Sequence, residues 1–322
     1  MVNLNDKTIL VTGGAGFIGS NFLDYIFKNY TDMKVVNFDK MGVGSRDYTP
    51  PTDNNSYIRQ RHDIRLLDHP YLGNLNLPDA KYDYIFHFAA ESHVDRSINS
   101  PMDFISNNVI GITALLEYMR VHQPQARFIN VSTDEVYGHL GLDDPPFTEN
   151  SPIAPRSPYA ASKASADLVA RSYYTTYGLD IITTRCCNNY GPWQHSEKFI
   201  PTVIRSLKEG KNIPVYGNGQ NIREWIYVED HNKSLLEIAG RGRSGEVYNI
   251  GSGLEFSNLD MVEMLVKEVT EEQRYWLERV EFVEDRKGHD FRYAIDSIHY
   301  IRGFALTEFE YGIKQTVAHY IK

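Results

Sequence analysis

A glycine-rich turn near the start of the chain constrains the fold more than any other feature. Residues 8–11 read Thr-Ile-Leu-Val, which predicts a short strand, and apolar side chains at helical spacing follow from Phe22. Between these segments lie Gly13, Gly16 and Gly19. In a strand–turn–helix unit the first glycine permits a tight turn, the second lets the backbone approach a pyrophosphate, and the third allows close helix–strand packing. Taken alone the spacing is weak evidence, because an ordinary glycine-rich turn shows it too.

An acidic residue stands where a dinucleotide site needs one. Asp39 ends the strand predicted at residues 34–38 and lies 20 residues after Gly19. A carboxylate there accepts hydrogen bonds from the adenosine ribose hydroxyls and repels a 2′-phosphate. The two features together predict an α/β protein with a doubly wound parallel sheet, the Rossmann fold, and NAD as its cofactor. Lys40 slightly weakens the predicted preference for NAD over NADP, because a basic side chain nearby could tolerate a 2′-phosphate.

Three reactive side chains stand in a row at Thr133, Asp134 and Glu135. The apolar run at residues 126–131 before them predicts a buried strand, so the row lies where a strand ends. In an open α/β sheet ligands bind at that end of the strands. An isolated Thr-Asp-Glu is usually a solvated turn. Here the glycine turn that precedes it and the Tyr-x-x-x-Lys that follows favour an active site.

Tyr159 and Lys163 open a predicted helix and lie four residues apart, so they share one helix face. An ammonium beside a phenol favours phenolate and is expected to lower the pKa of Tyr159 from about 10. A tyrosine tuned in this way can act as a general base near neutral pH. A lone Tyr-x-x-x-Lys is common by chance. The glycine turn and Thr133 upstream are what favour a catalytic role for this one.

Two further strand ends carry candidate cofactor contacts. Asp63 and Ile64 follow a third short strand and could hold the edge and face of the adenine, although a strand-end acid and a core isoleucine explain them equally well. The strand at residues 84–88 leads to Ala89 and Ala90, whose small side chains would let a cofactor lie against the backbone. His93 nearby is more simply explained as a hydrogen-bonded structural histidine.

Composition narrows the partners and the compartment. The 322 residues carry a net charge of −9, which argues against nucleic acid or an anionic membrane as the main partner. An anionic ligand needs only a local cluster, and Lys198, Arg223 and Arg286 would suit a diphosphate, although each alone would be an ordinary surface charge. Cys186 and Cys187 are adjacent and form a poor disulfide pair, which favours a reduced, cytoplasmic protein. No zinc spacing and no apolar run of about 18 residues is present.

We expect two interleaved domains. The apolar run at residues 247–251 is expected to return to the large sheet, which divides each domain into two parts. The dinucleotide-binding domain is predicted to comprise residues 1–189 and about 229–251, and a smaller α/β domain that binds substrate to comprise residues 190–228 and 252–322.

Four longer motifs carry a resemblance to a known family. Residues 88–97, 132–138, 188–192 and 288–296 read Phe-Ala-Ala-Glu-Ser-His-Val-Asp-Arg-Ser, Ser-Thr-Asp-Glu-Val-Tyr-Gly, Asn-Asn-Tyr-Gly-Pro and Gly-His-Asp-Phe-Arg-Tyr-Ala-Ile-Asp. With the glycine turn and the Tyr-x-x-x-Lys they resemble the extended short-chain dehydrogenase/reductases, and among these the dTDP-glucose 4,6-dehydratases. The resemblance runs from about residue 7 to about residue 296. Related epimerases and decarboxylases lack the Asp-Glu pair, and GDP-mannose dehydratases carry Ser in place of the Asp.

The resemblance implies a mechanism. Tyr159 takes the proton of the glucose 4-hydroxyl while hydride leaves C4 for NAD, and Thr133 hydrogen-bonds the same oxygen. Lys163 tunes Tyr159 and holds the nicotinamide ribose. Glu135 then removes the C5 proton, Asp134 protonates the departing C6 hydroxyl, and hydride returns to C6, giving a 4-keto-6-deoxy sugar. One carboxyl must be charged and its neighbour protonated, which adjacent like charges encourage.

The resemblance also implies contacts for both ligands. The residues assigned to NAD are Gly13, Gly16, Phe17, Ile18, Gly19, Asp39, Lys40, Asp63, Ile64, Phe88, Ala89, Ala90, Ser132, Tyr159, Lys163 and Asn189. The residues assigned to the nucleotide-diphosphate-glucose substrate are Ser92, Thr133, Asn188, Lys198, Phe199, Pro214, Tyr216, Arg223, Asn258, Arg286 and His289. The loop after Asp39 departs from the family, because it reads Lys-Met-Gly-Val-Gly-Ser where Tyr-Ala-Gly-Asn is usual.

Three alternatives stay open. UDP-glucose 4,6-dehydratases share every catalytic motif quoted above. A nucleotide-sugar 4-epimerase shares the hydride chemistry but has no use for the acid–base pair, and a non-catalytic NAD-sensing protein would typically lose Tyr159 or Lys163. The resemblance implies a homodimer formed by two helices per subunit, for which the candidates are a helix expected at residues 107–119 and the helix that carries Tyr159.

Overall fold

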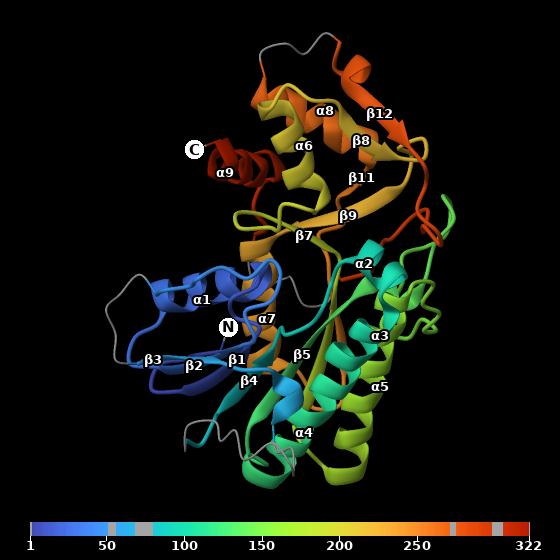
Figure 1. Ribbon diagram of the computed structural model, residues 1–322. Helices are drawn as coiled ribbons and strands as arrows, with labels where there is room; N and C mark the ends of the chain where they lie inside the picture. Colours follow the sequence, from blue (N-terminus) through green and yellow to red (C-terminus); the bar gives the residue numbers. More distant parts are fainter. Residues whose placement is uncertain (1, 51–55, 68–79, 271–274, 298–304, 322) are drawn as a thin grey trace.

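The computed structural model describes residues 2–50, 56–67, 80–270, 275–297 and 305–321. Its centre is a seven-stranded sheet in the order β10-β6-β5-β4-β1-β2-β3, with every pair parallel (Figure 1). The predicted doubly wound parallel sheet is thus confirmed. The strands are β1 (Thr8–Thr12), β2 (Lys34–Asp39), β3 (Tyr57–Arg61), β4 (Tyr84–His87), β5 (Arg127–Thr133), β6 (Ile181–Cys186) and β10 (Val247–Ile250).

Helices cover both faces of this sheet, which explains why its strands are apolar on both sides. Successive residues of β1 point to opposite faces, so Val11 packs in one buried cluster with Phe22 while Leu10 packs in the other with Leu115. The first cluster lies under α1 (Phe17–Asn29) and α7 (Val228–Arg241), and the second lies under α4 (Gly111–His122) and α5 (Pro158–Tyr177). Among the described residues no helix is both long and apolar enough to pass through a membrane.

The helix expected at residues 107–119 begins earlier than predicted. The backbone is helical from Pro101, through α3 (Pro101–Phe104) and the π-helical turn η2 (Ile105–Ile110) into α4, and a separate short helix α2 (Val94–Asn99) precedes it. The prediction was wrong here because the polar run at residues 106–108 interrupts the apolar spacing. Proline is favoured at the first position of a helix, and Pro101 marks the true start here.

A second group of elements lies beyond the carboxyl ends of the large sheet (Figure 1). One small sheet has the order β11-β9-β7, and β12 pairs with β8. The apolar run at residues 247–251 returns to the large sheet as expected, because β10 pairs with β6. The domain division at residues 189, 229 and 251 stays a prediction. The elements of this group are β7 (Asn188–Tyr190), β8 (Ile213–Tyr216), β9 (Ile222–Tyr227), β11 (Glu255–Ser257), β12 (Val280–Val283), α6 (Phe199–Lys208), α8 (Asn258–Val269) and α9 (Phe309–Ile321).

Candidate active site

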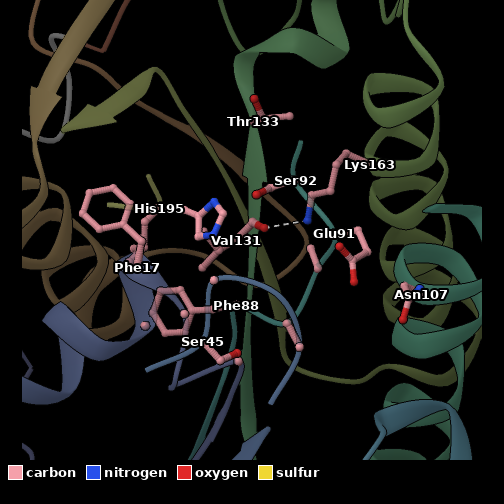
Figure 2. A pocket seen from close by; sticks show the side chains of 18 of the residues that line it. Phe17, Ser45, Phe88, Glu91, Ser92, Asn107, Val131, Thr133, Lys163 and His195 are labelled. Carbon is pink, nitrogen blue, oxygen red and sulfur yellow. Dashed lines mark hydrogen bonds between the residues drawn. The ribbon is translucent and has the colours of Figure 1, made fainter. Parts of the chain in front are cut away.

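The carboxyl ends of β1, β2, β4, β5 and β6 open into one cavity of about 310 Å³ (Figure 2). The cavity lies where chain order reverses in the sheet, since β1 has β2 on one side and β4 on the other. Every residue assigned above to NAD lines it. They are Gly13, Gly16, Phe17, Ile18, Gly19, Asp39, Lys40, Asp63, Ile64, Phe88, Ala89, Ala90, Ser132, Tyr159, Lys163 and Asn189.

The glycine turn leaves no room for side chains at two of its positions. Gly13 has a φ of +74°, and a Cβ there would lie 2.5 Å from the backbone nitrogen of Ala89. A Cβ on Gly19 would lie 2.4 Å from the carbonyl oxygen of Gly13. The turn therefore brings the start of α1 close to the ends of β1 and β4. The free backbone N–H groups of that helix start favour an anion such as a pyrophosphate.

Asp39 is buried beside this turn, and its carboxylate is already oriented. It accepts hydrogen bonds from the backbone N–H groups of Ala15, at 2.9 Å, and Met41, at 2.7 Å. A carboxylate has about four lone-pair sites, so it can still accept hydrogen bonds from ribose hydroxyls. Asp63 also faces the cavity, where its carboxylate pairs with Arg65 at 2.6 Å.

Thr133 ends β5, and Asp134 and Glu135 follow it in a single 3-10 turn, η3 (Asp134–Tyr137). The hydroxyl of Thr133 accepts the backbone N–H of Glu135 at 3.3 Å and donates to Oδ1 of Asp134 at 3.2 Å. All three residues line the cavity, as predicted from the strand end. Asp134 is 2% exposed, and its Oδ2 atom is buried without a hydrogen-bond partner among the described residues. That oxygen is thus available to a ligand.

The two carboxyl groups lie in different electrostatic surroundings. Burial raises the pKa of Asp134 well above its usual value, and the negative charge of Glu135 raises it further. Burial also raises the pKa of Glu135, but Arg286 and Lys198 oppose that shift by stabilising its carboxylate. Burial and the neighbouring charges therefore favour protonation of Asp134 more than of Glu135, which is the division of roles that an acid and a base need.

Tyr159 and Lys163 come from the first turns of α5, which Ser157 caps by accepting the backbone N–H of Ala160 at 3.1 Å. The Lys163 ammonium donates to the carbonyl oxygen of Val131 at 2.8 Å (Figure 2). Burial lowers the pKa of Lys163, and the charge of Asp167 opposes that shift.

The predicted lowering of the Tyr159 pKa is wrong for the protein without a bound ligand. Burial raises the pKa of Tyr159 well above 10, and the negative charge of Glu135 raises it further, while a hydrogen bond with Thr133 opposes the shift. Lys163 is directed to Val131 instead of the phenol. Desolvation of the phenol outweighs the charge effect expected from helix spacing.

Some of the residues assigned to the substrate line the cavity and others do not. Ser92, Thr133, Asn188 and Lys198 line it, and the Lys198 ammonium donates to the carbonyl oxygen of Ser92 at 2.7 Å. Seven lie outside its lining: Phe199, Pro214, Tyr216, Arg223, Asn258, Arg286 and His289. Two of these seven still act on the catalytic row, because the charges of Arg286 and Arg223 lower the pKa of Glu135.

Tyr216, Arg286 and His289 form a group next to this cavity. The Arg286 guanidinium lies 5.8 Å from the centre of the Tyr216 ring, and the His289 ring lies 6.0 Å from the same ring. The Tyr216 hydroxyl donates to Asp95 of α2 at 3.3 Å. The charge of Asp95 also acts on Lys198, which places this group close to the cavity lining.

The structure adds lining residues that were not assigned above to either ligand. Glu91 and Asn107 both bind the Lys40 ammonium. Glu91 stood inside a quoted motif, but nothing marked it as a partner of Lys40. The others come from segments without periodic patterning or from strand ends: Phe38, residues 42–45, His62, Val131, Cys186, Cys187, Gln194 and His195.

The cavity fits a ligand rich in hydroxyl and amide groups. Ser132 Oγ, Asn189 Oδ1 and Gln194 Oε1 are buried in its lining without partners among the described residues. Buried polar atoms normally have a partner, so these three are positioned for a ligand or water. Within the described ranges no three His, Cys, Asp or Glu side chains come together as a metal site would need. Cys186 and Cys187 are both buried free thiols.

Comparison with known proteins identifies the family of this chain. The family model described as GDP-mannose 4,6 dehydratase matches residues 10–303. A dTDP-glucose 4,6-dehydratase of Neisseria meningitidis serogroup B is 43% identical over 335 residues, which cover 98% of this chain and 93% of that protein. The chain belongs to the dTDP-glucose 4,6-dehydratase family.

Two further proteins are similar to this chain over most of its length. The low-salt glycan biosynthesis protein Agl12 of Haloferax volcanii is 48% identical over 291 residues, 90% of each protein. The crystal structure of DesIV, a dTDP-glucose 4,6-dehydratase of Streptomyces venezuelae with NAD and TYD bound, aligns with a TM-score of 0.88 at 40% identity. That alignment covers 98% of this chain and 97% of DesIV.

Proposed function

We propose that this protein is an NAD-dependent nucleotide-sugar 4,6-dehydratase, a hydro-lyase that converts dTDP-glucose to dTDP-4-keto-6-deoxyglucose. One observation carries the proposal. The Thr133–Asp134–Glu135 row opens into the same cavity as the glycine turn, Tyr159 and Lys163. An acid–base pair beside a hydride-transfer site supports elimination of water as well as oxidation of an alcohol.

The cofactor that the cavity supports best is NAD. The glycine turn suits a pyrophosphate, Asp39 suits ribose hydroxyls, and Ser132, Asn189 and Gln194 offer unpaired polar atoms. NAD, when bound, supplies the acceptor that takes hydride from C4 and returns it to C6, and its positively charged ring favours phenolate at Tyr159. We assign Lys163 to the nicotinamide ribose.

The chain's own groups move the protons. Tyr159 accepts the proton of the C4 hydroxyl, while Thr133, which directly precedes the two carboxyl residues, hydrogen-bonds the same oxygen. The C4 ketone acidifies the C5 proton, and Glu135, whose carboxylate Arg286 and Lys198 stabilise, removes that proton. Asp134, held protonated by burial, gives its proton to the departing C6 hydroxyl. Lys198, Arg223 and Arg286 are cations whose charges stabilise the Glu135 carboxylate, and we assign them to the diphosphate.

Two rival functions make less use of the site. A 4-epimerase needs hydride transfer at C4 but no acid–base pair at C5 and C6. A non-catalytic NAD-sensing protein has no need to keep Asp134 protonated beside Glu135. The buried acid at Asp134 favours the dehydratase. Burial of a carboxyl costs free energy of folding, which is explained if the group has a catalytic role.

The base of the substrate is the least constrained part of the proposal. Thymine differs from uracil by one methyl group, which is worth only about 1–3 kcal/mol in a hydrophobic pocket. The test incubates the protein with dTDP-glucose and UDP-glucose side by side and follows loss of water by mass spectrometry. We expect both to lose water and dTDP-glucose to be preferred. A tenfold or greater preference for UDP-glucose would overturn the choice of base. Formation of UDP-galactose, which has the mass of UDP-glucose and is identified by NMR, would instead indicate an epimerase.

We further propose a homodimer formed through α4 and α5, which pack together along one side of the large sheet (Figure 1). Light scattering is expected to give the mass of two chains, and Leu168→Glu on α5 is expected to give monomers. Phe282→Glu, an apolar residue exposed on β12, is the control and should stay dimeric. Monomers in the unmodified protein would contradict the proposal. Apolar side chains exposed on α3, η2, α4 and α5 are Met102, Ile105, Ile110, Val121, Leu168, Tyr174 and Tyr177.

The two adjacent free thiols support a reducing compartment, and we infer a cytoplasmic location. The proposed product is a 4-keto-6-deoxy sugar nucleotide. Such a product suits the synthesis of deoxysugars such as rhamnose, which requires epimerisation at carbons next to the ketone and reduction of the ketone.

A further inference from the structure

Lys40 is bonded to two segments that lie far from it in the sequence. Its ammonium donates to Oε1 of Glu91 and to Oδ1 of Asn107, both at 2.7 Å. Lys40 follows β2, Glu91 lies beyond the end of β4, and Asn107 belongs to the π-helical turn η2. All three line the cavity, and Figure 2 shows Glu91 and Asn107 together on its helix-covered side. The bridge therefore joins the segment after Asp39 to the segment after β4.

Glu91 is fixed in place by its backbone. Its N–H donates to Oδ1 of Asn108 at 2.8 Å, and its carbonyl oxygen accepts from Nδ2 of Asn108 at 3.0 Å. Asn108 is buried and also donates to the Ser162 hydroxyl of α5 at 2.8 Å. An ion pair loses part of its energy to the ordering of both side chains. A fixed backbone at Glu91 reduces the ordering that the pair with Lys40 requires.

The position of this pair bears on the choice between NAD and NADP. Asp39 repels a 2′-phosphate, whereas a basic residue nearby accommodates one. Lys40 directly follows Asp39, so a free ammonium there would offset the repulsion. In the structure that ammonium is paired with Glu91. Glu91 also adds a second carboxylate to the lining of the cavity.

We propose that Glu91 is a determinant of cofactor specificity that acts through Lys40. By holding the ammonium, Glu91 withholds it from a 2′-phosphate and reinforces the discrimination begun by Asp39. The inference rests on the proposed function, because it assumes a dinucleotide in this cavity. Glu91 is thus a positioning residue, and its effect falls on the ratio of two affinities.

The test measures the dissociation constants of NAD and NADP by isothermal titration calorimetry. Glu91→Gln keeps the shape of the side chain and removes its charge. We expect the affinity for NADP to rise relative to NAD by about two- to fivefold, the range of a partly exposed ion pair. Glu91→Asp, whose carboxylate is one methylene shorter, is a second variant expected to shift the ratio in the same direction. The double variant Lys40→Met/Glu91→Gln should lose the gain, since no ammonium is left to release.

Glu117→Gln is the matched control, because Glu117 also pairs with a cation, Arg120, but does not line the cavity. Its ratio should equal that of the unmodified protein. An unchanged ratio in Glu91→Gln and Glu91→Asp would overturn the inference and leave the proposed function standing. An equal gain in the double variant would also overturn it, since Glu91 would then not act through Lys40. Failure of the unmodified protein to bind either dinucleotide would overturn both.

Discussion

Replacement of Tyr159 by Phe is expected to reduce turnover by about 10²- to 10⁴-fold, the usual cost of removing a positioned acid or base. Without the Tyr159 hydroxyl, the site has lost the base assigned to the C4 proton, so the first oxidation is blocked. We expect the variant to bind cofactor and substrate but to show no absorbance of reduced nicotinamide when substrate is added. Rapid-scan absorbance and product mass spectrometry measure the two effects.

Tyr173→Phe is the control for that variant. Tyr173 lies on the same helix, where its hydroxyl donates to Glu117, and it does not line the cavity. The control should keep full turnover. If Tyr159→Phe still turned over at the unmodified rate, another group would have to be the base.

Asp134→Asn and Glu135→Gln are expected to cause losses of the same order, about 10²- to 10⁴-fold, but at a later step. Both variants keep Tyr159, so oxidation at C4 can proceed. Elimination then lacks its acid or its base, and hydride cannot return until water has left. We therefore expect reduced nicotinamide to appear on addition of substrate and to persist, in contrast to Tyr159→Phe. Full turnover in both variants would refute the assigned roles, and absence of reduced nicotinamide would place these carboxyls in the first step instead.

Local sequence patterns predicted many of the residues that line the cavity. The strand before Gly13, the acid at Asp39 and the strand end at Thr133 each depend on a few consecutive residues and on the rule that ligands bind at the carboxyl ends of parallel strands. Their meeting in one cavity follows from that rule. The order of strands in the sheet then fixes which ends lie next to one another.

Features that depend on packing between distant segments were not predictable in the same way. Helix spacing places Lys163 on the face of Tyr159, yet only the folded chain shows that its ammonium reaches Val131. The rise in the Tyr159 pKa comes from burial, which spacing does not reveal. Likewise Glu91 and Lys40 are separated by strands and helices, so no local pattern pairs them. The start of the helix at Pro101 was missed because a π turn disturbs the apolar period.

The central claim is that one active site oxidises C4, eliminates water across C5 and C6, and returns the same hydride to C6. The most direct test uses dTDP-glucose labelled with deuterium at C4 and locates the label in the product by mass spectrometry and NMR. We predict a product that has lost water and carries the deuterium at C6. Deuterium recovered at C4 in a product that has kept its water, or loss of the label to solvent, would contradict the account.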